Sequence, residues 1–409
     1  MSYQILSEIS SDLITEAESL KFVRESLLNK LEPPEQNASI LRGARGIGKS
    51  TVVLQYLSKR QGEGKKVLYI SADSTLLDQS LSQVALEFNK RGGDYLAIDE
   101  IHRYPKWQDD LKTIIDAFRK LKVIVSGSSA IELDAHGSDL SRRHQVISGL
   151  GLSFREYIQK NCDLVLPTIS FHQLTTEYEE ISFEVTKQFA EVKLDLLLQF
   201  KAYLRSGYFI SRENYKTDAI YFASLINSIN TIIDADLPSV HSEIDSLGRE
   251  RIKQLLKSIA KKCPFTPNIS ELGRSLGIAN DNTLKKYLFY LDQGEVLLNL
   301  YKKNRTHKDF PKPQKILFAN TNYAFAYFSN PEVGTIREIF SAGVLKHLGD
   351  ITSPDVGDIL FNDDYLFEIG GRSKNHKQIK KIQNHFVLAD DILIPEKQKI
   401  PLWMLGLLL

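Results

Sequence analysis

The chain has 409 residues, of which 42% are hydrophobic and 25% are charged, the proportions of an ordinary folded protein. This length exceeds what a single hydrophobic core usually supports, so about two to four domains are expected. The formal net charge of +1 excludes a uniformly basic surface, and any contact with nucleic acid must come from a local patch.

Cysteine usage and the two chain ends bear on the setting of the protein. Cys162 and Cys263 are far apart, which argues against a disulfide framework or a zinc site and favours a reducing cytoplasm. The first residues lack the layout of a signal peptide. The apolar stretch 400–409 is too short to cross a bilayer, which needs about 20 helical residues. We expect a buried strand there, with a short membrane or partner anchor as the alternative, and a soluble cytoplasmic protein without membrane contact.

Short apolar runs alternate with helical patterns over residues 1–153. A helix is expected at 11–31, and amphipathic patterns predict further helices at 50–60 and 107–120. Runs rich in Val and Ile predict strands that are buried on both faces at 38–42, 66–71, 95–98, 122–126 and 145–148. Such alternation predicts an α/β fold, a mainly parallel sheet with helices on both faces.

The first predicted strand runs directly into GARGIGKST, which matches the phosphate-binding pattern G-x-x-x-x-G-K-[ST]. Its glycines permit backbone dihedral angles that aim N–H groups at phosphate oxygens, and the next helix offers the positive end of its dipole. We expect Lys49 to reach the β- and γ-phosphates of ATP and the Ser50 hydroxyl to bind Mg²⁺. The predicted nucleotide-binding residues are Gly43, Ala44, Arg45, Gly46, Ile47, Gly48, Lys49, Ser50 and Thr51.

Two acids follow the apolar run at 95–98. Asp99 is expected to bind Mg²⁺, and Glu100 to polarise a water molecule for attack on the γ-phosphate. Solvated acids at the head of a loop are the alternative interpretation. Ser126, which ends the fourth predicted strand, is a candidate sensor of the γ-phosphate or part of an ordinary turn.

Paired arginines precede the fifth predicted strand. Arg142 and Arg143 are candidates for fingers that reach into a neighbouring subunit and stabilise the transition state, or they belong to a solvated basic turn. The first interpretation implies a homo-oligomer.

Helical periodicity replaces strand patterns after residue 153, notably at 193–204 and 218–233, and predicts a helical lid or a static connector. Residues 268–291 then indicate a helix, a turn at Gly277 and a second helix, and segments 295–301 and 315–318 indicate the strands of a wing. A DNA-contacting surface or a solvated charge run are the two interpretations of the basic residues Lys285, Lys286, Lys302, Lys303, Arg305 and Lys308.

The last part of the chain carries three acids, Glu338, Asp358 and Glu368, in an order that resembles PD-(D/E)xK nucleases. In that family an acid pair binds Mg²⁺ and a lysine two positions later activates water. Gly370 occupies the lysine position here, and Lys374 could reach the site only with an unusual spacing. We expect a degenerate site without nuclease activity.

Taken together, the motifs resemble AAA-type ATPases of bacteria and archaea with a C-terminal domain of unknown function. The resemblance rests on GARGIGKST, YLAIDEIHRYPKW, VIVSGSSA, DLSRR, LSFREY, PFTPNISELGRSLGI, ILFANTN, FEIGGRSK and IPLWMLGLL. It implies a P-loop ATPase core, a helical lid, a winged helix-turn-helix and a small nuclease-like α/β domain. We place these parts at 1–153, 154–245, 246–328 and 329–409.

The leading interpretation is a Mg²⁺-dependent ATP hydrolase whose nucleotide state drives a conformational output on double-stranded DNA or a protein partner. The alternatives are a slow nucleotide-gated switch that acts as a DNA-binding regulator, and a metal-dependent nuclease.

Overall fold

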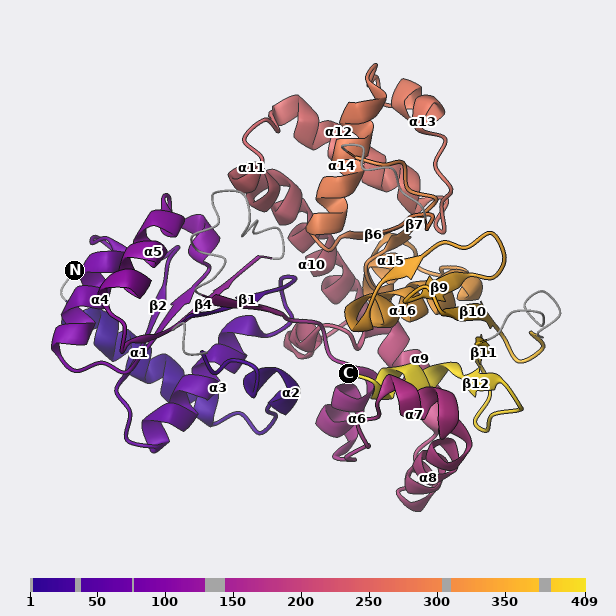
Figure 1. The fold of residues 1–409 in the computed structure, drawn as a ribbon, viewed down its shortest axis with the longest axis horizontal. Coiled ribbons are helices and arrows are strands. Elements are labelled where there is room, and N and C mark those ends of the chain that lie inside the picture. Colours follow the sequence, from indigo (N-terminus) through magenta and orange to yellow (C-terminus); the bar gives the residue numbers. More distant parts are fainter. Residues whose placement is uncertain (1–2, 34–37, 76, 129–143, 304–309, 375–383) are drawn as a thin grey trace. The chain divides into compact units, whose positions relative to one another are not determined.

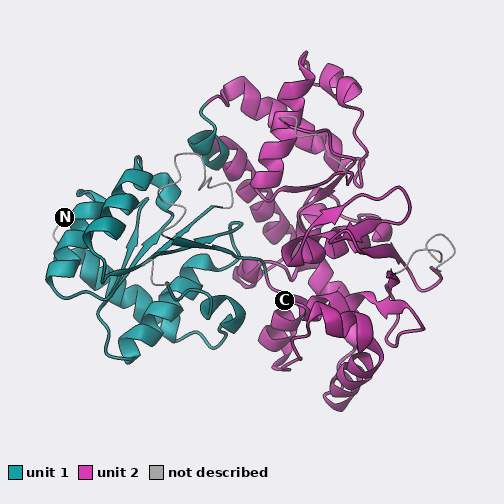
Figure 2. Cartoon of the chain, in the orientation of Figure 1, with its two compact units in different colours: residues 1–151, 235–242 teal, residues 152–234, 243–409 magenta. Residues whose placement is uncertain are grey.

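The computed structural model describes residues 3–33, 38–75, 77–128, 144–303, 310–374 and 384–409. These residues form two compact units (Figure 2). The first unit comprises 1–151 and 235–242, and the second comprises 152–234 and 243–409. Segment 235–242, which the sequence places within a helical lid, therefore belongs to the first unit. Helical periodicity in the sequence predicts that a segment is a helix, but it does not predict which compact unit that helix packs against.

The first unit is built on a sheet of five parallel strands in the order β2-β3-β4-β1-β5 (Figure 1). The strands are β1 Ala38–Arg42, β2 Val67–Ser71, β3 Tyr95–Asp99, β4 Lys122–Gly127 and β5 His144–Ser148. Each predicted strand is present, with ends that differ by one residue at most. The predicted α/β fold with a parallel sheet is confirmed.

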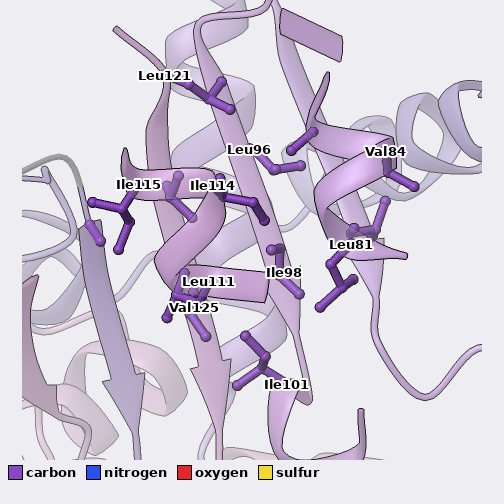
Figure 3. Packing of buried hydrophobic residues seen from close by; sticks show 14 of the residues in the cluster. Leu81, Val84, Leu96, Ile98, Ile101, Leu111, Ile114, Ile115, Leu121 and Val125 are labelled. Carbon is purple, nitrogen blue, oxygen red and sulfur yellow. The ribbon is translucent and has the colours of Figure 1, made fainter. Parts of the chain in front are cut away.

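Helices cover both faces of this sheet because alternate strand residues point to opposite sides. Leu96 and Ile98 of β3 pack towards α4 and α5, where Leu81 and Ile114 complete one core (Figure 3). Ala97, between them, belongs to the second core, which lies under α1, α2 and α3. Burial of each Leu or Ile side chain contributes about 1.5–3 kcal/mol. The helices are α1 Tyr3–Glu18, α2 Glu25–Leu28, α3 Lys49–Gly62, α4 Leu81–Lys90, the 3₁₀ turn η1 Ile101–Arg103 and α5 Trp107–Ala117.

The single helix expected at 11–31 is wrong, because the chain leaves the helical conformation between α1 and α2. Arg24 caps α2 with φ −84° and ψ 77°, outside the helical region, and its side chain binds carbonyl groups elsewhere in the unit. That tertiary interaction replaces the continuous helix that local propensity favours.

The second unit begins with helices, as the periodicity predicts. They are α6 Phe154–Cys162, α7 Phe171–Thr176, α8 Tyr178–Glu191, α9 Leu196–Ser206, α10 Asp218–Thr231 and α12 Ser246–Ala260. A five-residue π-helix, Ile232–Asp236, follows α10 and leads into the short α11 Leu237–Val240, which lies in the first unit.

Helices and strands also form where the helix-turn-helix pattern places them. Helix α13 Ile269–Ser275 is separated from α14 Asp281–Gln293 by Gly277, whose φ of +64° suits a glycine-terminated turn. Strands β6 Leu297–Leu300 and β7 Lys315–Phe318 pair antiparallel.

The last part of the chain forms a second five-stranded sheet, in the order β12-β11-β10-β9-β8. Strands β10, β11 and β12 run parallel, whereas β8 and β9 are antiparallel neighbours. The elements are α15 Thr321–Tyr327, α16 Val333–Leu348, β8 Ile351–Thr352, β9 Ile359–Phe361, β10 Tyr365–Gly370, β11 His385–Ala389 and β12 Lys399–Pro401.

The apolar segment at 400–409 is buried, but it is a strand only as far as Pro401. A 3₁₀ helix, Leu402–Leu407, continues it, and Trp403 is 1% exposed. Among the described residues, no helix is both long and apolar enough to cross a membrane.

Candidate active site

The phosphate loop joins β1 to α3 at the carboxyl edge of the first sheet. Gly46 and Gly48 have φ values of 84° and 91°, which side chains disfavour, and a β-carbon on Gly43 would lie 2.5 Å from the Gly149 carbonyl oxygen. No side chain caps the start of α3. The first N–H groups of an α-helix can bind an anion, which is the role that the sequence predicts for the start of α3.

Lys49, at the start of α3, is 5% exposed and folds back onto the loop. Its Nζ atom donates to the carbonyl oxygens of Gly43 at 2.8 Å and of Ala44 at 3.0 Å. Phosphate oxygens bind an ammonium group more strongly than neutral carbonyls do. Lys49 is thus held where a phosphate bound by the loop would compete for it.

Asp99 ends β3 and is 3% exposed. One carboxylate oxygen accepts from the Tyr69 hydroxyl at 2.6 Å, and the other accepts from the Ser126 hydroxyl and from the Glu100 amide at 2.9 Å. Burial raises the pKa of the Tyr69 phenol, and the nearby Asp99 carboxylate raises it further. A hydrogen bond with Ser50 acts in the opposite direction and lowers this pKa. Tyr69 therefore lies between Ser50 and Asp99, the two predicted Mg²⁺ ligands.

The backbone of Glu100 is in the left-handed region, with φ 50° and ψ 36°. Such strain in a residue other than glycine is found most often at functional sites. Its side chain is 21% exposed, and Oε2 lies 3.7 Å from Arg45 Nη2 and 3.5 Å from His102 Nε2. The predicted general base is therefore engaged by two neighbours.

A carboxylate from segment 235–242 completes this arrangement. The Asp236 side chain is fully buried, and its oxygens accept from Arg45 Nε and Nη2 at 3.1 Å each and from Arg103 Nη2 at 2.9 Å. His102 Nε2 lies 3.6 Å from Asp236 Oδ1, beyond ordinary hydrogen-bond length. Burial alone would raise the pKa of Asp236, but His102 and Arg45 outweigh it and hold the pKa well below its usual range. We call Arg45, Glu100, His102, Arg103 and Asp236 the Asp236 cluster.

Arg24 supports the phosphate loop from beneath. It is 4% exposed, and its guanidinium donates to the carbonyl oxygens of Ile47 at 3.0 Å, Leu150 at 2.7 Å and Gly151 at 3.0 Å. A single side chain thus ties the loop to the segment after β5.

The structure therefore brings the loop, Asp99, Glu100 and Ser126 together, and adds residues that sequence reasoning missed. Arg24, Tyr69 and Asp236 lie in none of the motifs, and His102 and Arg103 lie in YLAIDEIHRYPKW without an assigned role. His102 and Arg103 follow the two acids directly and could have been noticed there. Asp236 could not, because 191 positions separate it from Arg45. The predicted fingers, Arg142 and Arg143, lie outside the described residues.

In the second unit, the predicted basic surface is partly paired. Lys302 Nζ lies 2.7 Å from Asp355, and Lys303 Nζ lies 3.4 Å from Asp363. The Lys286 ammonium sits over the Phe310 ring at 5.4 Å, and Lys285 is half-buried. Arg305 and Lys308 lie outside the described residues.

The three acids near the C-terminus are paired with lysines. Lys315 on β7 lies 2.6 Å from Glu338 on α16 and 3.9 Å from Asp358, while Lys374 Nζ lies 2.6 Å from Glu368 on β10. Burial raises the pKa of Glu338, and Lys315 opposes that shift. Within the described ranges, no three His, Cys, Asp or Glu side chains are grouped so as to hold a metal ion.

The missing lysine of the nuclease pattern is replaced through space. A β-carbon on Gly370 would lie 2.7 Å from Cβ and Cγ of Lys374, so the Lys374 side chain occupies the room beside that glycine. Lys374 therefore reaches this region with the unusual spacing that the sequence left open. The turn after β10 folds Lys374 back beside Gly370.

Residues 35–158 match a family model described as an AAA domain. With the loop and the acids at one sheet edge, this match makes the first unit similar to the nucleotide-binding domains of AAA ATPases. Among curated protein sequences, none is significantly similar to the chain.

Solved structures with partial similarity include a replication initiator DnaA bound to AMPPCP and single-stranded DNA, at 16% identity and a TM-score of 0.25, covering 71% of this chain and 89% of that one. AMPPCP-bound DnaA from Aquifex aeolicus has 14% identity and a TM-score of 0.25, with coverages of 70% and 86%. PCH-2 from C. elegans has 20% identity and a TM-score of 0.23, with coverages of 37% and 42%. Likenesses at these scores carry no inference about function.

Arg24 offers a test of how the phosphate loop is held. Arg24→Met removes three hydrogen bonds to carbonyl oxygens, and we expect the free energy of unfolding to fall by about 2–4 kcal/mol. Arg91→Met is the control, because Arg91 forms an exposed pair with Glu87 and should cost less than about 1 kcal/mol. Urea denaturation measures both values. Equal losses would contradict a special role for Arg24.

Proposed function

We propose that the first unit binds ATP with Mg²⁺ and hydrolyses it to ADP and phosphate. The observation that carries this proposal is the convergence of Lys49, Ser50, Asp99, Glu100 and Ser126 at the carboxyl edge of one parallel sheet. A phosphate loop alone indicates only an anion. The strained acid next to a buried aspartate adds the means to activate water.

The residues at this edge suit Mg²⁺, which prefers hard oxygen ligands and keeps several waters. The Ser50 hydroxyl and the Asp99 carboxylate both neighbour the Tyr69 phenol, so they lie within reach of one small cation. Ser50 and Asp99 would hold the ion, which when bound supplies positive charge to the β- and γ-phosphates.

Glu100 has the role of general base in this proposal. Its carboxylate accepts a proton from water as the water oxygen bonds to the γ-phosphorus and the bond to the bridging oxygen of ADP breaks. Lys49 neutralises the charge that develops on the phosphates. Ser126 donates to Asp99 and is 1% exposed, which suits a group that responds to the γ-phosphate.

The second unit supplies the output in this proposal. Helices α13 and α14 with strands β6 and β7 suit a winged helix-turn-helix that contacts double-stranded DNA. The pairs of Lys302 with Asp355 and of Lys303 with Asp363 are exposed and therefore weak, so DNA phosphates can displace the acids.

We propose a structural role for the C-terminal acids. Lys315 and Lys374 neutralise Glu338, Asp358 and Glu368 in a partly buried network, where isolated carboxylates would be costly. Lys315 lies 2.6 Å from Glu338 and 3.9 Å from Asp358, so its ammonium group faces both acids.

Two substitutions test ATP binding and hydrolysis separately. Lys49→Ala should weaken ATP binding by about 10- to 100-fold, because a charge-assisted contact contributes about 1.5–3 kcal/mol. Glu100→Gln should retain binding and lower kcat by about 10²- to 10⁴-fold. Calorimetric titration and phosphate release measure the two effects, with the exposed Glu63→Gln as control. Wild-type turnover no faster than that of Glu100→Gln would refute hydrolysis by this site.

DNA contact predicts duplex binding that weakens with salt. Replacing Lys302, Lys303 and Arg305 with Ala should lower the slope of log affinity against log salt by about 1 for each phosphate that the variant no longer neutralises. Fluorescence anisotropy with a duplex at several salt concentrations measures this slope. The matched control replaces three exposed lysines of the same unit, Lys187, Lys193 and Lys216. Equal behaviour of the two triple variants would remove the wing from the proposal.

The C-terminal network predicts a loss of stability when one partner is removed. Lys315→Met leaves Glu338 without its nearest cation and should lower the free energy of unfolding by about 1–3 kcal/mol. Lys187→Met, from an exposed pair with Glu191, should change it by less than about 0.5 kcal/mol. DNA cleavage with Mg²⁺ or Mn²⁺ that disappears in Glu368→Gln would contradict a purely structural role.

A further inference from the structure

The Asp236 cluster links the phosphate loop to a segment that comes from much later in the chain. Arg45 belongs to the loop, between Gly43 and Gly46, and its guanidinium is shared by Asp236 and Glu100. Asp236 forms the closer contact, a bidentate pair of two 3.1 Å hydrogen bonds. The same carboxylate that holds Arg45 therefore also keeps it beside the proposed general base.

We propose that Asp236 is a positioning residue of this site, which retains Arg45 and thereby restrains Glu100 until the γ-phosphate of a nucleoside triphosphate draws Arg45 away. This inference rests on the proposed function and adds to it a residue that discriminates between nucleoside triphosphate and diphosphate. It also makes segment 235–242 the part of the chain that senses the change.

Competition for one guanidinium provides the physical reason. An anion bound by the loop and the carboxylate of Asp236 both seek the fork of donors on Arg45, and a charged phosphate is the stronger acceptor. The incoming phosphate also repels the two nearby carboxylates, because like charges in a partly buried site are poorly screened. A diphosphate lacks the terminal group and leaves more of the original pairing intact.

Release of Arg45 changes the neighbours of Glu100. Glu100 Oε2 lies 3.7 Å from Arg45 Nη2 and 3.5 Å from His102 Nε2. The His102 ring accepts from the Ser128 amide at Nδ1, at 3.4 Å, and its Nε2 atom makes no hydrogen bond. Once Arg45 moves to the phosphate, Glu100 is free to turn towards a water molecule while His102 stays in place.

The backbone around Asp236 is suited to respond. Asp236 ends the π-helix Ile232–Asp236, an irregular element that occurs frequently at functional sites. The border between the two units falls within it, between Asp234 and Ala235, and the second unit resumes at Glu243. Segment 235–242 is therefore joined covalently to the second unit at both of its ends, so a shift of this segment pulls on both connections.

Reciprocity of coupled equilibria gives a sharp test. If the triphosphate weakens the hold of Asp236, then loss of that hold must strengthen triphosphate binding. Asp236→Asn should lower the Kd of a non-hydrolysable ATP analogue by about five- to fifty-fold, with the Kd of ADP changed less than about twofold. In turnover, KM for ATP should fall while kcat changes less than about twofold, and Asp236→Glu should restore the wild-type preference.

Asp234→Asn is the matched control, because Asp234 is two positions away and pairs with Lys253 in the second unit. It should leave the preference for triphosphate over diphosphate unchanged. Hydrogen exchange in the wild-type chain adds a readout that needs no variant. Amides of 235–242 should exchange faster with the ATP analogue than with ADP.

An unchanged preference in Asp236→Asn, or equal loss of affinity for both nucleotides, would overturn the inference and leave ATP binding standing. If Asp236→Asn fails to fold, hydrogen exchange in the wild-type chain decides. Equal exchange rates of segment 235–242 with the ATP analogue and with ADP would then overturn the inference. If neither nucleotide binds the wild-type chain, the proposed function itself fails, and the inference falls with it.

Discussion

The parallel pairing of β4 with both β1 and β3 is the constraint on which the candidate site depends. In this register, Leu41 of β1 lies opposite Ser126, and Ile98 of β3 lies opposite Val125. The three strands therefore end at one edge, with β4 in the middle. Ser126 is consequently placed between the phosphate loop and the acids that follow β3, and its hydroxyl reaches Asp99. The backbone hydrogen bonds between the strands therefore determine how far Ser126 lies from the loop and from Asp99.

Charge balance explains the other contacts at this edge. An anion site needs cations, yet partly buried cations require partners when no anion is bound. Lys49 finds carbonyl groups of its own loop, whereas Arg45 and Arg103 share Asp236. The cations at this edge are thus satisfied by groups that a phosphate can replace. The cations can exchange these partners for phosphate oxygens with little net loss of hydrogen bonds. This exchange allows the site to respond to a ligand.

In the C-terminal sheet, the buried charges are carboxylates, and lysine side chains of the same unit neutralise them. Lys315 and Lys374 reach its acids from β7 and from the turn after β10, and the absence of a side chain at Gly370 leaves room for Lys374. The two regions differ in where the cations come from. In the first unit, Arg45 and Lys49 belong to the phosphate loop and Arg103 to η1, whereas in the second unit the lysines lie on β7 and in the turn after β10.

The local features of this protein could be predicted from its sequence: the positions of the five strands of the first sheet, the glycine and lysine spacing of the loop, and the two acids at the end of β3. Those features depend on backbone propensity and on neighbours a few positions apart. Other features arise only when the chain is folded. Arg24 breaks a helix to hold the loop, Tyr69 lies between Ser50 and Asp99, and Lys374 fills the space beside Gly370.

Asp236 shows most clearly why these features could not be predicted. Its partner Arg45 is 191 positions away along the chain. Two residues so far apart meet because the sheet and the helices bring them together, and their ion pair depends on geometry that no short segment contains. A long-range ion pair therefore leaves no periodicity or spacing in the sequence that could reveal it.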